Sequence, residues 1–313
     1  MEKKATRVAY GETLVELGRE NQDIVVLDAD LSGSTKTAMF AKEFPDRFFN
    51  MGIAEQNMIN TAAGLASVGK IPFASSFAVF ATGRAWEMIR QAVCLGEQNV
   101  KIVATHAGIT VGEDGATHQA LEDIAVTRVL PHITVIVPAD YYEARAVIRF
   151  AAAYKGPMYV RLSRSETPVV FDDTVEFQHG RARVLREGTN LSLFACGVMV
   201  SEALNAAQQL QDAGISVEVI NVSTIKPLDA ETIAASVSKT GLAATVEEHN
   251  IIGGLGSAVA EALCEHHPAP LKRIGMVERF GRSGKSGDLM KLFGLTAPAI
   301  AETCRRFVEE HRT

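Results

Sequence analysis

Short apolar or β-branched runs alternate along this chain with longer segments of helical period, and no other feature limits its possible folds as strongly. Each short run predicts a strand covered on both faces, and each helical segment predicts a crossover to the next parallel strand. We therefore expect an α/β fold of doubly wound, mostly parallel sheets. The predicted strands cover residues 23–30, 71–77, 100–106, 133–139, 158–163, 191–196, 216–222, 242–248 and 272–277. The predicted helices lie near residues 54–68, 79–95, 118–128, 140–154, 200–213, 229–238, 255–265 and 297–311.

A polar stretch at 165–190 interrupts the alternation. It carries Pro168, Gly180 and Gly188 and shows no sustained period, which is typical of a linker. The chain has 313 residues, of which 47% are hydrophobic, so it is long and apolar enough for two cores. We therefore expect a first domain at 1–165, a linker at 166–190 and a second, smaller α/β domain at 191–313.

The composition excludes several classes of partner. There are 31 lysines and arginines against 37 aspartates and glutamates, and no basic run is interleaved with aromatic residues. Nucleic acid is therefore not an expected partner. The start of the chain lacks a signal-peptide pattern, and the longest apolar runs reach only about half a membrane span. The four cysteines contain no C-x-x-C pair and are expected to be reduced, so the predicted location is cytoplasmic, without a membrane partner.

Polar residues follow the predicted strands of the first half. In open parallel sheets ligands bind beyond the carboxyl ends of the strands. The first strand ends in Asp28 and Asp30, and the next five residues include Ser32 and Ser34. These residues fit either a turn that caps a helix or a ligand-binding loop.

Glu55 begins a predicted helix that is otherwise mostly apolar or small. A glutamate in a first helical turn is commonly explained by the helix dipole alone. The pattern here predicts a helix that is buried all round, and a buried carboxylate must find a donor or keep its proton. Such groups gather at functional sites, so Glu55 is a candidate catalytic residue.

The segment 105–119 combines His106 and His118 with Glu113, Asp114 and three glycines. The glycines let the backbone pass close to a ligand, and imidazoles beside carboxylates suit proton transfer and hydroxyl recognition. The spacing matches neither the H-E-x-x-H pattern nor the EF-hand loop. We therefore expect no metal ligands in this chain.

Several segments in the same order resemble a known family. The segments NMGIAEQNM (50–58), SSFAVF (75–80), GEDGATHQ (112–119) and VRLSR (160–164) resemble the pyrimidine-binding domain of transketolase. NVSTIKPLD (221–229) and EEHNIIGGLGSAVAE (247–261) resemble the C-terminal domain shared by transketolases, deoxyxylulose-phosphate synthases and the β chains of 2-oxoacid dehydrogenases. The resemblance covers essentially the whole chain. It implies a thiamine-diphosphate-dependent enzyme that transfers a two-carbon ketol unit between sugar phosphates, as in the pentose phosphate pathway.

The resemblance also implies roles for individual residues. Glu55 matches the carboxylic acid that bonds to the pyrimidine ring of the cofactor, and Phe77 and Phe80 match the aromatic wall around that ring. Asp30 is a further expected cofactor contact. Many relatives carry an aromatic residue where this sequence has Gly83, so that part of the wall differs here.

Substrate contacts follow from the same resemblance. His106 and His118 match residues that contact the ketose near its reacting carbonyl and hydroxyl groups, with a catalytic role, and Asp114 matches a residue that recognises a hydroxyl group further along the sugar. The positions that bind the phosphate correspond to Arg7, Ser34 and Arg164. Ala116 stands where relatives usually have proline, a difference that is not expected to change the chemistry.

One family signature is missing. Relatives hold the diphosphate of the cofactor through Mg²⁺ or another divalent cation on a separate domain, marked by Gly-Asp-Gly and an asparagine further along. This sequence contains no Gly-Asp-Gly. The resemblance therefore implies the C-terminal subunit of a split transketolase, with an N-terminal subunit that carries this motif and most of the cation contacts. Self-association of this chain as a dimer, and a heterotetramer with two chains of each kind, are then expected.

Three alternatives remain open. A deoxyxylulose-phosphate synthase fragment would show a YPR-type ending where this chain has VRLSR, and a 2-oxoacid dehydrogenase β chain would show an H-S-Q type loop in place of GEDGATHQ. A non-catalytic subunit could also retain the fold. The presence of Glu55, His106 and His118 argues against that last alternative.

Overall fold

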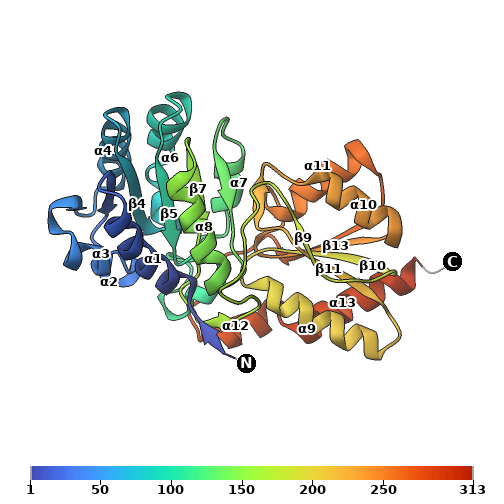
Figure 1. Cartoon of the computed structure of the whole chain (residues 1–313). Coiled ribbons are helices and arrows are strands. Elements are labelled where there is room, and N and C mark those ends of the chain that lie inside the picture. Colours follow the sequence, from blue (N-terminus) through green and yellow to red (C-terminus); the bar gives the residue numbers. More distant parts are fainter. Residues whose placement is uncertain (1, 312–313) are drawn as a thin grey trace.

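Two mostly parallel sheets, each covered by helices on both faces, make up the molecule (Figure 1). The computed structural model describes residues 2–311. The strand order is β12-β6-β7-β5-β4-β2-β3 in the seven-stranded sheet and β14-β13-β10-β11-β9 in the five-stranded sheet. A third, two-stranded ladder pairs β1 (Lys3–Lys4) with β8 (Thr167–Pro168). The predicted fold class, α/β with doubly wound and mostly parallel sheets, is confirmed.

Six strands of the seven-stranded sheet are parallel to one another, and the edge strand β12 runs antiparallel. Residues that alternate along the strands divide between two cores. Ile24 and Val26 face the side covered by α1 and α8, and Val25 and Leu27 face the side covered by α4 and α5. The strands are β2 (Ile24–Asp28), β3 (Phe48–Asn50), β4 (Ile71–Phe77), β5 (Lys101–Thr105), β6 (Thr134–Ile136), β7 (Met158–Arg161) and β12 (Thr224–Lys226).

The helices of this sheet are mostly short, apart from three longer ones on its two faces. The longer helices are α1 (Thr6–Glu20), α4 (Glu55–Ser67) and α8 (Tyr141–Ala153). The shorter helices are α2 (Ser32–Thr35), α3 (Ala38–Glu43), α5 (Ala78–Gly83), α6 (Trp86–Met88), α7 (Asp123–Arg128), the 3₁₀ turns η1 (Pro45–Arg47) and η3 (Ile109–Asp114), and the π-helix η2 (Ile89–Leu95).

In the five-stranded sheet, β9 is the antiparallel edge strand and the other four strands are parallel. Helices α9 and α13 cover one face, and α10 and α11 cover the other (Figure 1). The strands are β9 (Arg183–Arg186), β10 (Leu191–Ala195), β11 (Val217–Asn221), β13 (Ala243–Asn250) and β14 (Leu271–Met276). The helices are α9 (Met199–Asp212), α10 (Ala230–Thr240), α11 (Leu255–His266), α12 (Ser286–Leu292) and α13 (Ala297–Glu310). The short helix α12 packs against η3 and so joins the two sheets.

Several elements differ from the sequence-based prediction. The structure breaks the helix predicted at 79–95 into α5, α6 and the π-helix η2. The predicted linker contains two short strands, β8 and β9. Strand β12 lies well beyond that linker in the sequence but pairs with β6 of the first sheet. The limits 1–165, 166–190 and 191–313 therefore stay a proposal about domains, with this one strand crossing between them.

No helix within residues 2–311 has the combination of length and apolar character that spanning a membrane requires. All four cysteines are free, and Cys94, Cys196 and Cys304 are buried whereas Cys264 is exposed. Burial raises the pKa of Cys94 to about 11, which keeps this thiol protonated at neutral pH.

Candidate active site

Five candidate residues lie at one edge of the seven-stranded sheet. Asp30 follows β2, Glu55 follows β3, Phe77 ends β4, His106 follows β5 and Arg164 follows β7. These five strands are parallel, so their carboxyl ends meet at the same edge. The ring contacts and hydrogen bonds around them define two groups, one aromatic and one basic.

Glu55 is the first residue of α4 and is only 3% exposed. Its Oε1 accepts a hydrogen bond from Nη1 of Arg84 at 3.0 Å, and the Arg84 side chain is 52% exposed. A carboxylate in a first helical turn is also favoured by the free amide groups there. Glu55 is thus a buried acid whose one described partner can move into solvent.

The sequence pattern predicts that helix α4, which Glu55 begins, is buried all round. The structure shows that this prediction is wrong. Gln56, Asn57 and Asn60 of α4 are exposed in this chain, whereas Met58 and Ile59 are fully buried. The helix therefore presents exposed polar side chains next to the carboxylate, of which Asn60 donates from Nδ2 to Sδ of Met88 at 3.2 Å.

Four aromatic rings form a cluster that Arg84 connects with this carboxylate. Phe77 stacks on His106 with ring centroids 3.8 Å apart and an interplanar angle of 13°. Phe80 lies parallel to Phe77 at 6.0 Å and meets the edge of His118 at 5.2 Å. The guanidinium of Arg84 covers Phe80 at 4.5 Å, which links the rings to Glu55. Four residues that the sequence singled out, Phe77, Phe80, His106 and His118, thus form one cluster.

His106 is held in an unusual backbone conformation, with φ at 58° and 2% exposure. Left-handed backbone is uncommon for residues other than glycine and is found disproportionately at functional sites. Burial, with further contributions from the cations of Arg7 and Arg164, lowers the pKa of His106 to about 3. The imidazole is therefore neutral at physiological pH. Its Nδ1 lies 2.8 Å from Oγ1 of Thr105.

The basic group joins three predicted phosphate positions. Arg7 donates from Nη1 to the carbonyl of Ser34 at 2.8 Å and from Nε to the carbonyl of Arg164 at 3.1 Å. Burial and the Arg164 cation lower the pKa of Arg7. The guanidinium groups of Arg7 and Arg164 are half-buried and carry like charges. An anion bound between them would offset this repulsion.

Arg164 also faces the loop that carries the predicted sugar contacts. Its Nη1 lies 3.4 Å from Oε2 of Glu113 and 3.8 Å from Oδ2 of Asp114. The loop requires glycine at Gly112 and Gly115, where φ is 84° and 75°. Asp114 thus lies beside the basic group, at the exposed end of the loop.

Asp30 is less closely connected to the other candidates. It is exposed, has φ at 64°, and accepts a hydrogen bond from Nδ2 of Asn50 at 3.0 Å. In the part of the chain that the structure describes, that is its one side-chain hydrogen bond. The buried neighbour Asp28 binds the loop after β2 instead, through Leu31, Thr35 and Thr37.

Arg84 is the residue that the sequence analysis missed. The available signal was its position four residues after Phe80, the spacing that brings side chains onto one face of a helix. For metals, residues 2–311 contain no group of three or more His, Cys, Asp or Glu side chains arranged as ligands.

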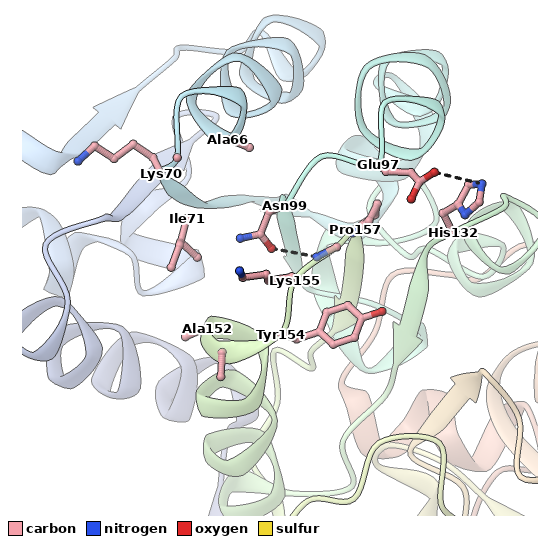
Figure 2. A pocket seen from close by; sticks show the side chains of 13 residues that line it. Ala66, Lys70, Ile71, Glu97, Asn99, His132, Ala152, Tyr154, Lys155 and Pro157 are labelled. Atoms are coloured by element: carbon pink, nitrogen blue, oxygen red, sulfur yellow. Dashed lines mark hydrogen bonds and ion pairs between the residues drawn. The ribbon is translucent and has the colours of Figure 1, made fainter.

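A pocket lies at the opposite edge of the same sheet, at the amino ends of its strands (Figure 2). This pocket measures about 640 Å³, and its lining includes Lys70, Asn99, Tyr154 and Lys155. None of the candidate residues lines it. The site built from the strand ends and this pocket are thus separate places.

Comparison with known proteins places these features in a family. Residues 2–170 match the family model of the transketolase pyrimidine binding domain, and residues 180–300 match that of the transketolase C-terminal domain. A solved structure described as "Split gene transketolase, inactive beta4 tetramer" superimposes with a TM-score of 0.90 at 50% identity, covering 99% of this chain and 100% of that one.

Relatives of two lengths match the sequence. A Methanocaldococcus jannaschii protein, named provisionally as a transketolase C-terminal section, is 54% identical, with 98% of this chain and 96% of that protein covered. A 6-deoxy-6-sulfo-D-fructose transketolase subunit of a Clostridium species is 41% identical, with 99% and 96% covered. Human transketolase is 39% identical over 98% of this chain, which spans 49% of the human protein.

Proposed function

Because this chain belongs to the transketolase family, we propose that it is the C-terminal subunit of a split transketolase. With a separate N-terminal subunit it transfers a two-carbon ketol unit from a ketose phosphate to an aldose phosphate. The observation that carries the proposal is the buried Glu55 beside the cluster of Phe77, Phe80, His106 and His118.

The relatives support a division into two subunits. This chain covers nearly the full length of three separately encoded transketolase sections or subunits, but about half of human transketolase. The similar solved structure is a tetramer of one kind of chain and is described as inactive. Both facts agree with a chain that needs a second polypeptide to act.

The residues at the carboxyl edge fit the pyrimidine end of thiamine diphosphate. Glu55 offers a buried carboxyl group, and the nearly parallel rings of Phe77 and Phe80 offer a flat apolar wall. Gly83 is exposed, and apart from its own helix and chain neighbours no heavy atom lies within 4 Å of where its Cβ would stand. When bound, this cofactor supplies the carbon nucleophile that cleaves a ketose next to its carbonyl group.

Each residue of the cluster then has a separate task. Glu55 would hold the pyrimidine end of the cofactor through a hydrogen bond of its carboxyl group, whose Oε1 accepts from Arg84 in this structure. Phe77 and Phe80 hold the ring in position and exclude water. Asp30 is proposed as a cofactor contact on the same edge.

The substrate residues act beside that cluster. His106 is neutral, so its second nitrogen can exchange a hydrogen bond with a sugar hydroxyl without carrying a net charge. His118, at the edge of Phe80, serves the reacting carbonyl end. Asp114 binds a hydroxyl further along the chain of the sugar, and the phosphate lies against Arg7, Ser34 and Arg164.

The divalent cation, Mg²⁺ in the first instance, belongs to the partner in this proposal. The sequence has no Gly-Asp-Gly, and the described residues offer no group of carboxylates or imidazoles for such an ion. The partner is a subunit carrying that motif, and the minimal complete assembly is a heterotetramer in which two copies of this chain self-associate.

Reconstitution tests the proposal. This chain and an N-terminal subunit with the Gly-Asp-Gly motif are purified separately and mixed with thiamine diphosphate and Mg²⁺. We expect two-carbon transfer from a ketose phosphate only in the mixture. Robust transfer by this chain alone would contradict the split, and pyruvate decarboxylation by the mixture would favour the synthase or dehydrogenase alternatives.

The identity of the sugar needs a panel of donors. Among the similar subunits, one is named for 6-deoxy-6-sulfo-D-fructose and another for apulose 4-phosphate. Both named substrates are sugars with an anionic group, which the basic group of Arg7 and Arg164 suits. A panel that compares phosphate, sulfonate and neutral donors measures this preference directly.

A further inference from the structure

One carboxylate of the five-stranded sheet reaches into the loop that carries the candidate sugar contacts. Glu248, on β13, is 2% exposed, and its Oε1 accepts a hydrogen bond from the backbone N–H of Thr110 at 2.5 Å. A Cβ at Gly108 would lie 2.3 Å from the Glu248 carboxyl carbon. Glycine at that position therefore leaves the room that this carboxylate occupies.

A backbone hydrogen bond joins the two ends of this loop, which covers residues 108–119. The Gly108 N–H donates to the carbonyl of Ala120 at 2.9 Å. Arg161, itself 6% exposed, donates from Nη2 to the carbonyls of Ala120 and Glu248 at 3.3 Å and 2.9 Å. Its Nε binds Asp123 at 2.7 Å. Arg161 thus joins Ala120, at the end of the loop, to the strand that bears Glu248.

The far part of the loop has two more contacts with the second half of the chain. Gln119 donates from Nε2 to the carbonyl of Arg282 at 2.8 Å. The hydroxyl of Ser283 donates to the carbonyl of Glu113. These contacts flank Asp114 and His118, so the second half of the chain holds the loop on both sides of its candidate sugar contacts.

A buried carboxylate needs a compensating role, because removing a charge from water is costly unless it is paired and hydrogen-bonded. The Thr110 amide donates a hydrogen bond to the Glu248 carboxyl group, and the Arg161 guanidinium, which binds the Glu248 backbone carbonyl, supplies a nearby positive charge. The part of the protein that it stabilises is not its own sheet but a loop of the other one. A purely structural acid, such as Glu218 paired with Lys239, has no such contact.

We propose that Glu248 is a positioning residue for ketol transfer, which holds residues 108–119 so that His106, Asp114 and His118 meet the sugar together. This inference rests on the proposed function, since it assigns a role in that reaction. It gives the second half of the chain a part in catalysis beyond contacts between subunits.

Hydrogen exchange tests the anchoring in the reconstituted complex. Glu248→Ala leaves the Thr110 amide without its acceptor, and we expect amides of 109–119 to exchange about tenfold faster or more. Glu248→Gln keeps an acceptor at the same place and should restore most of the protection. Glu218→Gln, which alters an equally buried glutamate of the same sheet, should leave this segment unchanged.

Steady-state kinetics with a ketose phosphate test the role toward the sugar. Glu248→Ala should raise the donor KM roughly tenfold, with a smaller effect on kcat, and Glu248→Gln should recover much of the loss. Equal loss in Glu218→Gln would mean general destabilisation and would overturn the inference. If Glu248→Ala does not fold, Glu248→Gln decides alone: a KM a few-fold above the wild-type value with normal folding supports the inference, and a wild-type KM overturns it.

The two proposals fail in different ways. In one outcome the wild-type complex transfers ketol units, and both Glu248 variants keep the wild-type hydrogen exchange and donor KM. This outcome overturns the positioning role but not the proposed function. Wild-type complex without ketol transfer, but with faster exchange in Glu248→Ala, overturns the proposed function and the role toward the sugar. It leaves the anchoring contact supported.

Discussion

The two edges of the seven-stranded sheet handle their polar groups in opposite ways. At the amino edge, buried Lys101 gives its Nζ hydrogens to Asn99 Oδ1 and to the carbonyls of Tyr154 and Gly156, at 2.6–2.9 Å. At the carboxyl edge, buried Glu55 has Arg84 as its one described partner, and that cation is half exposed. The pocket of Figure 2 lies at the amino edge, where the buried Lys101 has three hydrogen-bond acceptors. We therefore propose that incomplete pairing, more than cavity size, marks the ligand site of this sheet.

Replacing the acid at the carboxyl edge should have the largest effect. Glu55→Gln removes the proton that the proposed cofactor contact needs, and turnover of the reconstituted complex should fall roughly 10²- to 10⁴-fold. Its melting temperature should stay close to wild type, because the lost partner Arg84 is half exposed. Unimpaired turnover would favour the non-catalytic alternative.

Removing a cation of the basic group should have the next largest effect. Arg164→Ala should raise the KM for a phosphorylated donor about 10- to 100-fold, since a hydrogen bond to a charged group contributes roughly 1.5–3 kcal/mol. A donor without an anionic group should be affected much less. Arg149→Ala removes an arginine that pairs with Glu16 and Glu20 elsewhere on the surface, and it should change neither KM.

A substitution at the amino edge should affect stability and leave the chemistry unchanged. Lys101→Met leaves Asn99 Oδ1 and two carbonyls without their donor, so the free energy of unfolding should fall by roughly 1–3 kcal/mol. Denaturant titration measures this loss. Turnover per folded complex should not change, and a drop comparable to that of Glu55→Gln would break the contrast between the edges.

The smallest expected effect is a pH dependence at the carboxyl edge. The pKa of His106 is about 3 in the folded chain, against an ordinary value of 6.5 for histidine, so below about pH 6.5 the unfolded chain binds a proton that the folded chain does not. Unfolding is therefore favoured as pH falls, and the stability contributed by neutral His106 is present above pH 6.5 and lost toward acid.

Comparison with a variant isolates this effect. Between about pH 7 and about pH 5, wild type should lose on the order of 1 kcal/mol relative to His106→Gln, which cannot take up that proton. His132→Gln, which removes an exposed imidazole at the amino edge, serves as the matched control for the substitution itself. Parallel pH slopes for wild type and His106→Gln would mean that the burial of His106 does not govern its protonation.

Much of the fold could be predicted because the buried strands are short, continuous and apolar. The strand predicted at 71–77 is β4 with the same limits, and the runs at 100–106 and 191–196 contain β5 and β10. Helix α1 was not predicted, because Thr6, Gly11 and Thr13 share its buried face and obscure the apolar period. Strands β9 and β12 were missed because short antiparallel edge strands carry no such run.

The candidate site divides in the same way. Glu55 and His106 could be found because parallel strands bring their carboxyl ends to one edge, whereas Phe77 was indicated only by the family resemblance. Arg84 and Glu248 could not, since their importance comes from packing between segments far apart in the sequence, 29 residues for the first and 138 for the second. The spacing of four residues indicates Phe80 as a neighbour of Arg84, but nothing in the local pattern indicates Glu55 for Arg84 or Thr110 for Glu248.

Strand β12 has a consequence for how such a protein can be divided during evolution. The second half of the chain lends this strand to the first sheet, where it covers the backbone of β6. If the gene were split near residue 190, β6 would become an exposed edge strand whose unpaired backbone groups could pair with another molecule. The two halves are thus interlocked by a donated strand, and a fission event would be tolerated far more readily outside this pair than between its members.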